Sequence, residues 1–272
     1  MIYMPKKDWE DKIKKNIFNS EFDQYFDIFC ATRKFIHNLF PEKLEIYIAA
    51  CTLIFIHKFI ISSEEFSLKE SSKEDLYYLF GASSYISQIS LNCFYKSKND
   101  ISTYIQKLNE TEEPLKKIDI NDINKKLNEK EFDILCSIGF NCNIEFPFFN
   151  LSKIKDYLSK FKFDQKKFFT LLNYLVQDSY ILPICLFYTP NTINISSIQF
   201  LIDKSKLNFI KIQELIQLTG EEIDEEEVKQ CTNLIKQIED NIIKRAKSKD
   251  IKTKNEEKVE SIKGKNKTVD EE

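Results

Sequence analysis

Apolar side chains recur three or four residues apart along most of this 272-residue chain. That spacing places them on one face of an α-helix, whereas a half-buried strand would alternate apolar and polar residues. The pattern predicts helices over these residues: 21–40, 42–61, 71–89, 101–108, 122–139, 151–161, 164–188, 190–205, 209–218 and 224–245. Strand signals are sparse, and neither Asn-Gly nor Asp-Gly, the dipeptides of tight hairpins, occurs. The sequence therefore predicts an all-α fold.

Helix-end signals support these boundaries. Ser71 and Glu74 have the spacing of a capping box, which would open the third helix. Pro183 lies inside the 164–188 pattern and predicts a kink or a break, because proline lacks the backbone N–H that a helix interior uses. The other end signals are Asp164, Thr189 with Pro190, Gly220 and Asp224.

The helix predicted over 122–139 has the clearest one-sided pattern. Apolar or small residues occupy positions i, i+3, i+4, i+7 and i+8 along it, and we expect this stripe to face the core. Its members are Phe132, Leu135, Cys136, Gly139 and Phe140.

A break near the middle of the chain divides the helices into two groups. The segment 143–147 does not easily continue a helix, because the residue before a proline is pushed towards extended geometry. We therefore predict an N-terminal segment over 1–20 and two bundles of about five helices each, over 21–145 and 146–245. The remaining residues, 246–272, mix Lys and Glu with few apolar side chains, so we expect a disordered tail.

The most apolar run, Ile46–Ile56, is about 11 residues long, whereas a bilayer-spanning helix needs roughly 20. It predicts a helix buried on nearly all sides. The first 15 residues are polar and do not resemble a signal peptide. We therefore expect no association with a membrane.

Composition excludes several classes of function. The chain has 40 basic and 43 acidic residues, so it lacks the basic excess from which DNA-binding proteins take most of their affinity. We expect no direct sequence-specific DNA binding, although contact of the Lys-rich stretch 96–126 with RNA or a phosphorylated partner is an alternative. Four Gly and two His leave little material for phosphate loops, catalytic triads or His-based metal sites. We expect a protein that is not an enzyme and holds no cofactor or metal.

Seven cysteines are present, an odd number, and no Cys-x-x-Cys motif occurs. Most of them lie in or beside apolar runs, where a cysteine behaves as a small buried hydrophobe. The pattern indicates reduced core thiols in the nucleus or cytosol rather than disulfides or metal ligands.

Four short motifs resemble the cyclin family, and in particular the transcription-type cyclins K, T and L. Ile56-His57-Lys58-Phe59 is similar to their Tyr/Phe-x-His-Arg-Phe motif, and Leu79-Phe80-Gly81-Ala82 to their Leu-Phe-Leu-Ala. The stretch 138–147 is similar to the segment between their two boxes. Val176-Gln177-Asp178-Ser179, followed by Tyr188-Thr189-Pro190, resembles a helix and turn of their second box. The four motifs span about residues 22–205 in the family's order.

This resemblance implies tandem cyclin boxes in a non-catalytic regulatory subunit of a cyclin-dependent kinase. Its kinase would be transcription-associated and would phosphorylate the C-terminal domain of RNA polymerase II. The implied location is the nucleus, with the cytoplasm as a second compartment. One alternative is a cyclin H-like subunit of a kinase-activating kinase, together with a third assembly subunit. Another is a cyclin-fold scaffold or general transcription factor that activates no kinase.

In this family, the third and fifth helices of the first box pack against the αC helix of the kinase. A Glu on the fifth helix corresponds to Glu131, and its apolar partners correspond to Leu135 and Cys142. A Lys on the third helix corresponds to Ser84, so small polar and apolar residues replace a charged stretch here. The predicted kinase interface is Ser84, Tyr85, Ile86, Glu131, Leu135 and Cys142.

Helical spacing agrees with part of this assignment. Glu131, Leu135, Ile138 and Cys142 form a second stripe, which is rotated from the predicted core stripe. A second apolar stripe has to bury against something. Either a partner covers it or other helices of its own bundle do, and Glu131 is either an interface residue or a solvated charge.

Overall fold

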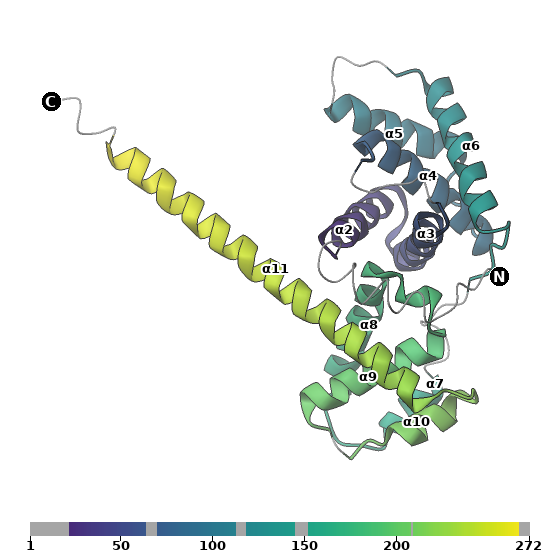
Figure 1. Ribbon diagram of the computed structural model, residues 1–272, viewed down its shortest axis with the longest axis vertical. Coiled ribbons are helices and arrows are strands. Elements are labelled where there is room, and N and C mark those ends of the chain that lie inside the picture. The colour runs from purple at the N-terminus through teal and green to yellow at the C-terminus, as the bar shows by residue number, and fades with distance from the viewer. Residues whose placement is uncertain (1–21, 64–69, 113–117, 145–151, 208, 267–272) are drawn as a thin grey trace.

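The computed structural model describes residues 22–63, 70–112, 118–144, 152–207 and 209–266, with side chains to residue 248 (Figure 1). The first group of helices is α2 (Phe22–Leu39), α3 (Glu42–Ser62), α4 (Lys73–Ser90), α5 (Lys98–Glu112) and α6 (Ile120–Ser137). The second is α7 (Ser152–Leu158), α8 (Gln165–Asp178), the 3₁₀ turns η2 (Ser179–Ile181) and η3 (Pro183–Leu186), α9 (Pro190–Ser205), α10 (Ile212–Thr219) and α11 (Glu225–Asn266). The described residues contain no strand, so this part of the chain is all-α, as predicted.

Local capping explains where several helices begin. Asp164 accepts a hydrogen bond from the Lys167 backbone N–H, and Thr189 caps α9 with Pro190 in the first turn, as predicted. The capping box of α4 is formed by Ser72 and Asp75, one residue later than the predicted Ser71 and Glu74. Both pairs have the required spacing, so only the structure distinguishes them.

The apolar helix α3 is the centre of the first group. It packs against α2, α4 and α6, and at one end against η2 and η3 of the second group. By length and composition α3 could also cross a bilayer, but 61% of its most apolar stretch is buried inside the molecule. This burial agrees with the predicted helix that is covered on nearly all sides.

The predicted core stripe of the fifth helix is wrong. In α6 the buried residues are Ile123, Leu127 and Ile134, whereas Phe132 and Phe140 are exposed. Both stripes satisfy helical spacing, and packing against α3, α4 and α5 selects the less aromatic one. On the same helix face, between Leu127 and Ile134, lies Lys130. Its ammonium group is 5.1 Å from the centre of the Phe59 ring. The aliphatic stem of a lysine can cover such a ring while its charge stays in water.

The long helix predicted over 164–188 ends ten residues early. α8 stops at Asp178, and two 3₁₀ turns follow, the second with Pro183 in its first turn. Proline fits the first turn of a helical segment because no N–H is needed there. The break predicted at Pro183 is therefore present, and it displaces the chain towards α3.

A buried hydrogen bond joins the two groups at this break. His57 of α3 donates from Nε2 to the Tyr180 carbonyl oxygen of η2, at 2.8 Å. The carbonyl can only accept, so Nε2 carries the proton. Burial lowers the pKa of His57 to about 4, since the charged form would lose its hydration. The imidazole is therefore neutral, and it acts as a structural link.

A second link is formed by α11, which extends along the molecule beyond the second group (Figure 1). The Arg245 guanidinium pairs with Asp23 and Asp27 of α2 and lies 4.6 Å from the centre of the Phe26 ring. The sequence indicated that this last helix fades after Arg245. In the structure α11 continues to Asn266, because Lys and Glu are good helix formers even without apolar packing.

The domain boundary predicted near 145–148 and the N-terminal segment 1–20 lie outside the described residues, and they stay predictions. The cysteines are only partly as expected. Cys51 and Cys231 are buried in the core, but Cys30 and Cys136 are exposed. Burial raises the pKa of the Cys51 and Cys185 thiols to about 12, so both stay protonated and unreactive.

Candidate functional site

The helices that carry the predicted interface, α4 and α6, run side by side in the same direction. Near their starts, Lys126 of α6 pairs with Glu74 of α4 at 2.9 Å. In their second halves, Tyr85 of α4 and Glu131 of α6 both contact Lys98, at the start of α5. Both C-terminal ends therefore lie at the same end of the first group, where α5 begins (Figure 1).

Close packing at Gly81 brings these helices together. A Cβ atom at this position would lie 2.9–3.0 Å from side-chain atoms of Ile105, Ile101 and Leu127, which is too close for an ordinary contact. The approach of α5 and α6 to α4 therefore favours a residue without a side chain here, since a methyl group would displace these side-chain ends. Gly81 replaces the second Leu of the resembled Leu-Phe-Leu-Ala motif, and the structure shows that this replacement lets the helices pack closely.

Lys98 connects two of the predicted interface residues. Its ammonium group forms an ion pair with Glu131 and donates a hydrogen bond to Asn128 Oδ1 at 2.9 Å. The same group lies 4.8 Å from the centre of the Tyr85 ring. Because the Glu131 side chain is only 13% exposed, the pair is better shielded from water than a surface ion pair. Tyr85 and Glu131 therefore form one cluster with a lysine from the start of α5.

Two predicted interface residues are not at the surface. Ser84 and Ile86 are completely buried, and the Ser84 hydroxyl donates to the Gly81 carbonyl oxygen at 2.8 Å. The reason is that α4 is covered by α3, α5 and α6, which leaves Tyr85 partly exposed and turns its neighbours inwards. A partner that docks on this surface therefore cannot touch Ser84 or Ile86 directly.

For the remaining predicted residues, Leu135 and Cys142, the sequence allowed cover either by a partner or by helices of their own group. The structure agrees in part with each alternative. Both are half-buried and pack against the core of their own group, yet both keep some exposed surface. Burial raises the pKa of the Cys142 thiol, although the nearby Lys58 opposes this. They can form the floor of a contact surface but not its most exposed part.

Sequence reasoning missed four exposed aromatic side chains in and after α4 and α6. They are Phe94, Tyr95, Phe132 and Phe140. Phe132 and Phe140 contact each other edge to face, with ring centres 6.4 Å apart. The adjacent pair Phe94-Tyr95, directly after a helix, was a signal that could have been used. Lys98 had no such signal, because its role depends on residues of two other helices.

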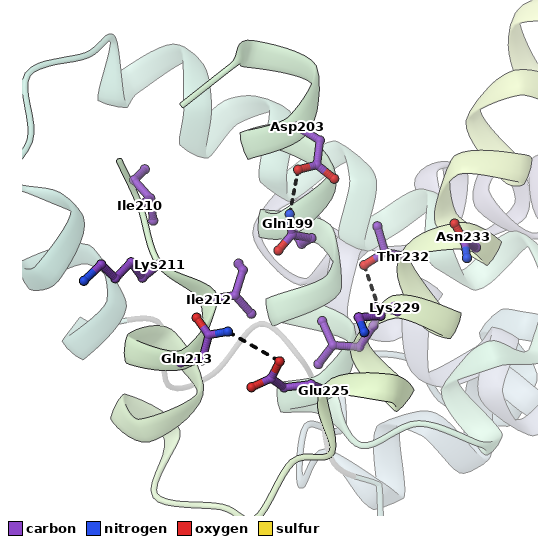
Figure 2. A pocket seen from close by; sticks show the side chains of 11 residues that line it. Gln199, Asp203, Ile210, Lys211, Ile212, Gln213, Glu225, Lys229, Thr232 and Asn233 are labelled. Atoms are coloured by element: carbon purple, nitrogen blue, oxygen red, sulfur yellow. Dashed lines mark hydrogen bonds between the residues drawn. The ribbon is translucent and has the colours of Figure 1, made fainter. Parts of the chain in front are cut away.

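A groove of about 570 Å³ lies in the second group, between α9, α10 and the start of α11 (Figure 2). Polar side chains on its wall are paired within the chain. Gln199 donates to Asp203 at 2.6 Å, and Gln213 donates to Glu225 at 3.4 Å. The residues that line the groove include no His or Cys, so we assign no chemistry to it. Within the described ranges, no group of three or more His, Cys, Asp or Glu could hold a metal ion.

Comparisons with known proteins agree with the fold. No protein-family model and no curated protein sequence matches the chain. Among solved structures, a chain of the yeast TFIIK (Kin28/Ccl1/Tfb3) complex, determined by cryo-electron microscopy, is similar with a TM-score of 0.55 and 14% identity. The match covers 86% of this chain and 96% of that one. The yeast complex contains a cyclin, Ccl1. At this identity the similarity shows a cyclin-like fold.

Proposed function

We propose that this chain is a cyclin-like regulatory subunit that binds and activates a cyclin-dependent serine/threonine kinase. The observation that carries the proposal is the cluster of Tyr85 of α4, Glu131 of α6 and Lys98 at the start of α5. The cyclin resemblance, which rests on sequence motifs alone, assigns Tyr85 and Glu131 to a kinase interface. Their meeting at one partly exposed surface of a cyclin-like fold supports that assignment.

The subunit performs no chemistry itself. Docking against the αC helix of a kinase would hold that helix so that its Glu pairs with the ATP-binding Lys, and would help to order the activation loop. The kinase would be transcription-associated, with the C-terminal domain of RNA polymerase II as its substrate, and the complex would be nuclear. These finer assignments rest on the motifs that resemble cyclins K, T and L.

A second candidate is a cyclin H-like subunit of a kinase-activating kinase. Two observations favour it: the similarity to a chain of TFIIK, whose name lists three components, and the long last helix α11. This candidate would require a third, assembly-type subunit. A scaffold or general transcription factor without kinase activation is the third candidate, favoured by the burial of Ser84 where cyclins carry a Lys.

Co-purification separates these candidates. The full-length tagged chain, expressed in its own cells, should recover a cyclin-dependent kinase, identified by mass spectrometry. The kinase should phosphorylate a heptad-repeat peptide of the polymerase tail only when the chain is present. Repeated recovery of no such kinase would rule out the proposal. A kinase that is bound but equally active without the chain would favour the scaffold.

A further inference from the structure

Six exposed lysines lie on and beside α7, which packs against α10 at the end of the second group that faces away from the first (Figure 1). They belong to residues 152–167, a segment with only two acidic residues, although the whole chain has a net charge of −3. The segment 204–211, which leads to α10, adds three lysines and no acidic residue. The near-balance of the composition therefore hides a strongly basic region. We call the six residues the lysine patch: Lys153, Lys155, Lys160, Lys162, Lys166 and Lys167.

The charge of this patch is not neutralised by neighbouring carboxylates. Within the described residues, the ion pairs of second-group lysines involve Lys204, Lys211 and Lys229, and none involves the lysine patch. Of the two acidic residues in the segment, Asp164 is used as the cap of α8, where it accepts a hydrogen bond from the Lys167 backbone N–H at 3.0 Å. The patch therefore presents positive charge that an anionic ligand can neutralise.

The Lys-rich stretch 96–126, which the sequence offered as a contact for RNA or a phosphorylated partner, differs in this respect. Lys98 forms an ion pair with Glu131, and Lys126 forms one with Glu74 at 2.9 Å. Part of its positive charge is thus used within the chain. The structure favours the lysine patch of the second group as the place where a polyanion binds.

Three aromatic rings form a continuous cluster beside these lysines. The ring centre of Phe161 lies 5.2 Å from that of Tyr157 and 5.3 Å from that of Phe209. The Lys160 ammonium group lies 5.9 Å from the centre of the Tyr157 ring. Lys153 is on the same face of α7 as Tyr157, because the two are four residues apart. The Phe209 side chain is 49% exposed, so a planar group of a ligand can reach its ring.

A second contact between a lysine and a ring lies on the other side of α7. The Lys155 ammonium group is 5.5 Å from the centre of the Phe169 ring, which belongs to α8 and is half-buried. Lys166 precedes Phe169 by three residues, so the two side chains share a face of α8. The basic surface therefore extends over α7 from Phe209 to α8.

This combination fits a single-stranded nucleic acid better than a phosphorylated protein segment. Proteins usually read a single phosphate group with arginine, whose planar fork donates two hydrogen bonds, and the two arginines of this chain lie on α2 and α11. Lysines act as point charges, which suits a backbone of repeated phosphates. Aromatic rings among such lysines stack on bases, and the faces of the bases are open only in an unpaired strand.

We propose that the lysine patch, together with the rings of Tyr157, Phe161 and Phe209, binds single-stranded RNA without strong sequence preference. The lysines attract and hold the phosphates, and Phe209 stacks on a base. RNA is the expected ligand because most unpaired strands in a cell are RNA. The site belongs to the second group, whereas the proposed kinase interface lies on α4 and α6. The inference therefore goes beyond the proposed function and does not depend on it.

The test measures binding of the purified full-length chain to a fluorescein-labelled oligo(U) RNA of about 15 nucleotides, by fluorescence anisotropy between about 50 and 200 mM NaCl. If about four lysines contact phosphates, the logarithm of the association constant should fall with the logarithm of salt with a slope of about −3, which is about a fiftyfold loss over this range. At 200 mM NaCl, a duplex RNA of the same length and a phosphorylated peptide should each bind at least about tenfold more weakly, because neither offers an open base to Phe209.

Two kinds of variant separate the phosphate contacts from the stacking. Lys153→Gln combined with Lys160→Gln should reduce the steepness of the salt slope by about 1, because two phosphate contacts are lost. Phe209→Ala should weaken binding at least about fivefold at every salt concentration and leave the slope unchanged, because stacking is not ionic. Phe209→Trp should retain binding, which shows that the ring is needed rather than the fold that Phe209 supports.

The first group supplies matched controls. Lys107→Gln combined with Lys125→Gln removes two exposed lysines of the stretch 96–126, and Phe94→Ala removes an exposed ring. Both should leave RNA binding unchanged. The inference is overturned if the RNA does not bind at 50 mM NaCl, if the control variants lose as much affinity as the patch variants, or if the duplex or the phosphorylated peptide binds as tightly as the single strand. None of these results bears on kinase binding, so the proposed function is decided by co-purification alone.

Discussion

The neutral state of His57 leads to a quantitative prediction about pH. The chain has two histidines, so His37→Gln leaves His57 as the single imidazole. His37 is exposed, with a contact to Glu45, and its replacement should affect the fold little. In this variant we expect the remaining imidazole proton resonance, followed by NMR, to show no titration between pH 7 and 5. Burial places the His57 pKa at about 4, compared with 6.5 for an unperturbed imidazole.

The same shift affects stability. The folded state binds the proton of His57 less readily than the unfolded state, so stabilisation is complete above pH 6.5 and is lost as the pH falls towards 4. From pH 7 to 5, linkage gives a loss of about 2 kcal/mol. Asp178 changes stability with pH in the opposite direction. Burial, with a smaller contribution from Glu239, raises the pKa of its carboxyl from 3.8 to about 6. Lowering the pH from 7 to 5 protonates this buried carboxyl and therefore raises the free energy of unfolding by about 1 kcal/mol.

These opposing effects define the assay. Urea unfolding followed by circular dichroism should give a free energy of unfolding that falls by less than about 1 kcal/mol from pH 7 to 5 in His37→Gln. Adding Asp178→Asn removes the opposing carboxyl, and the fall should grow to about 2 kcal/mol. An imidazole that titrates near pH 6.5, or a fall well below about 2 kcal/mol in the variant that also carries Asp178→Asn, would refute the buried neutral link between the two groups. Equal pH dependence in both variants would instead contradict the raised pKa of the Asp178 carboxyl.

Three further predictions test other parts of the structure. Gly81→Ala should lower the free energy of unfolding by less than about 2 kcal/mol, because crowding of the new methyl group against α5 and α6 is partly offset by the better helix propensity of alanine; thermal melting measures this, and a variant that is clearly more stable than the wild type would contradict the close packing. Arg245→Ala should cost about 1 kcal/mol and reduce the salt sensitivity of stability, because an ion pair and a ring contact are lost. Arg245→Lys is its control in the same urea titration. Glu131→Lys and Leu135→Arg should each weaken kinase binding in a pull-down while the free chain stays folded, and unchanged binding in both would remove these residues from the interface.

Much of the fold could be predicted because its signals are local. Helix ends at Thr189 and Gly220 depend on residues within a few positions, and both are where the sequence places them. The buried character of α3 follows from a run with almost no polar face. The capping box of α4 was one residue off because two neighbouring pairs satisfy the same rule. Local rules thus give the type of an element more reliably than its exact end.

The surface positions of the proposed interface residues were predictable only in part. Spacing relative to a resembled motif placed Glu131 and Tyr85 at one surface, but it also selected Ser84 and Ile86, which are buried. A helix that contacts four others, as α4 does, hides residues that a motif comparison counts as exposed. Lys98 was missed because its ion pair crosses from the start of one helix to the middle of another.

By itself, the sequence determined that the chain forms helices, roughly where they begin and end, and that one of them is buried on nearly all sides. Capping, proline geometry and apolar spacing act within a few residues, so the chain carries this information locally. Only the tertiary structure decided which face of α6 is covered. Two stripes on that helix satisfy the same periodicity, and the choice depends on the shapes of α3, α4 and α5. As a result, Ile123, Leu127 and Ile134 are in the core, and Phe132 and Phe140 are left at the surface, where a partner can reach them.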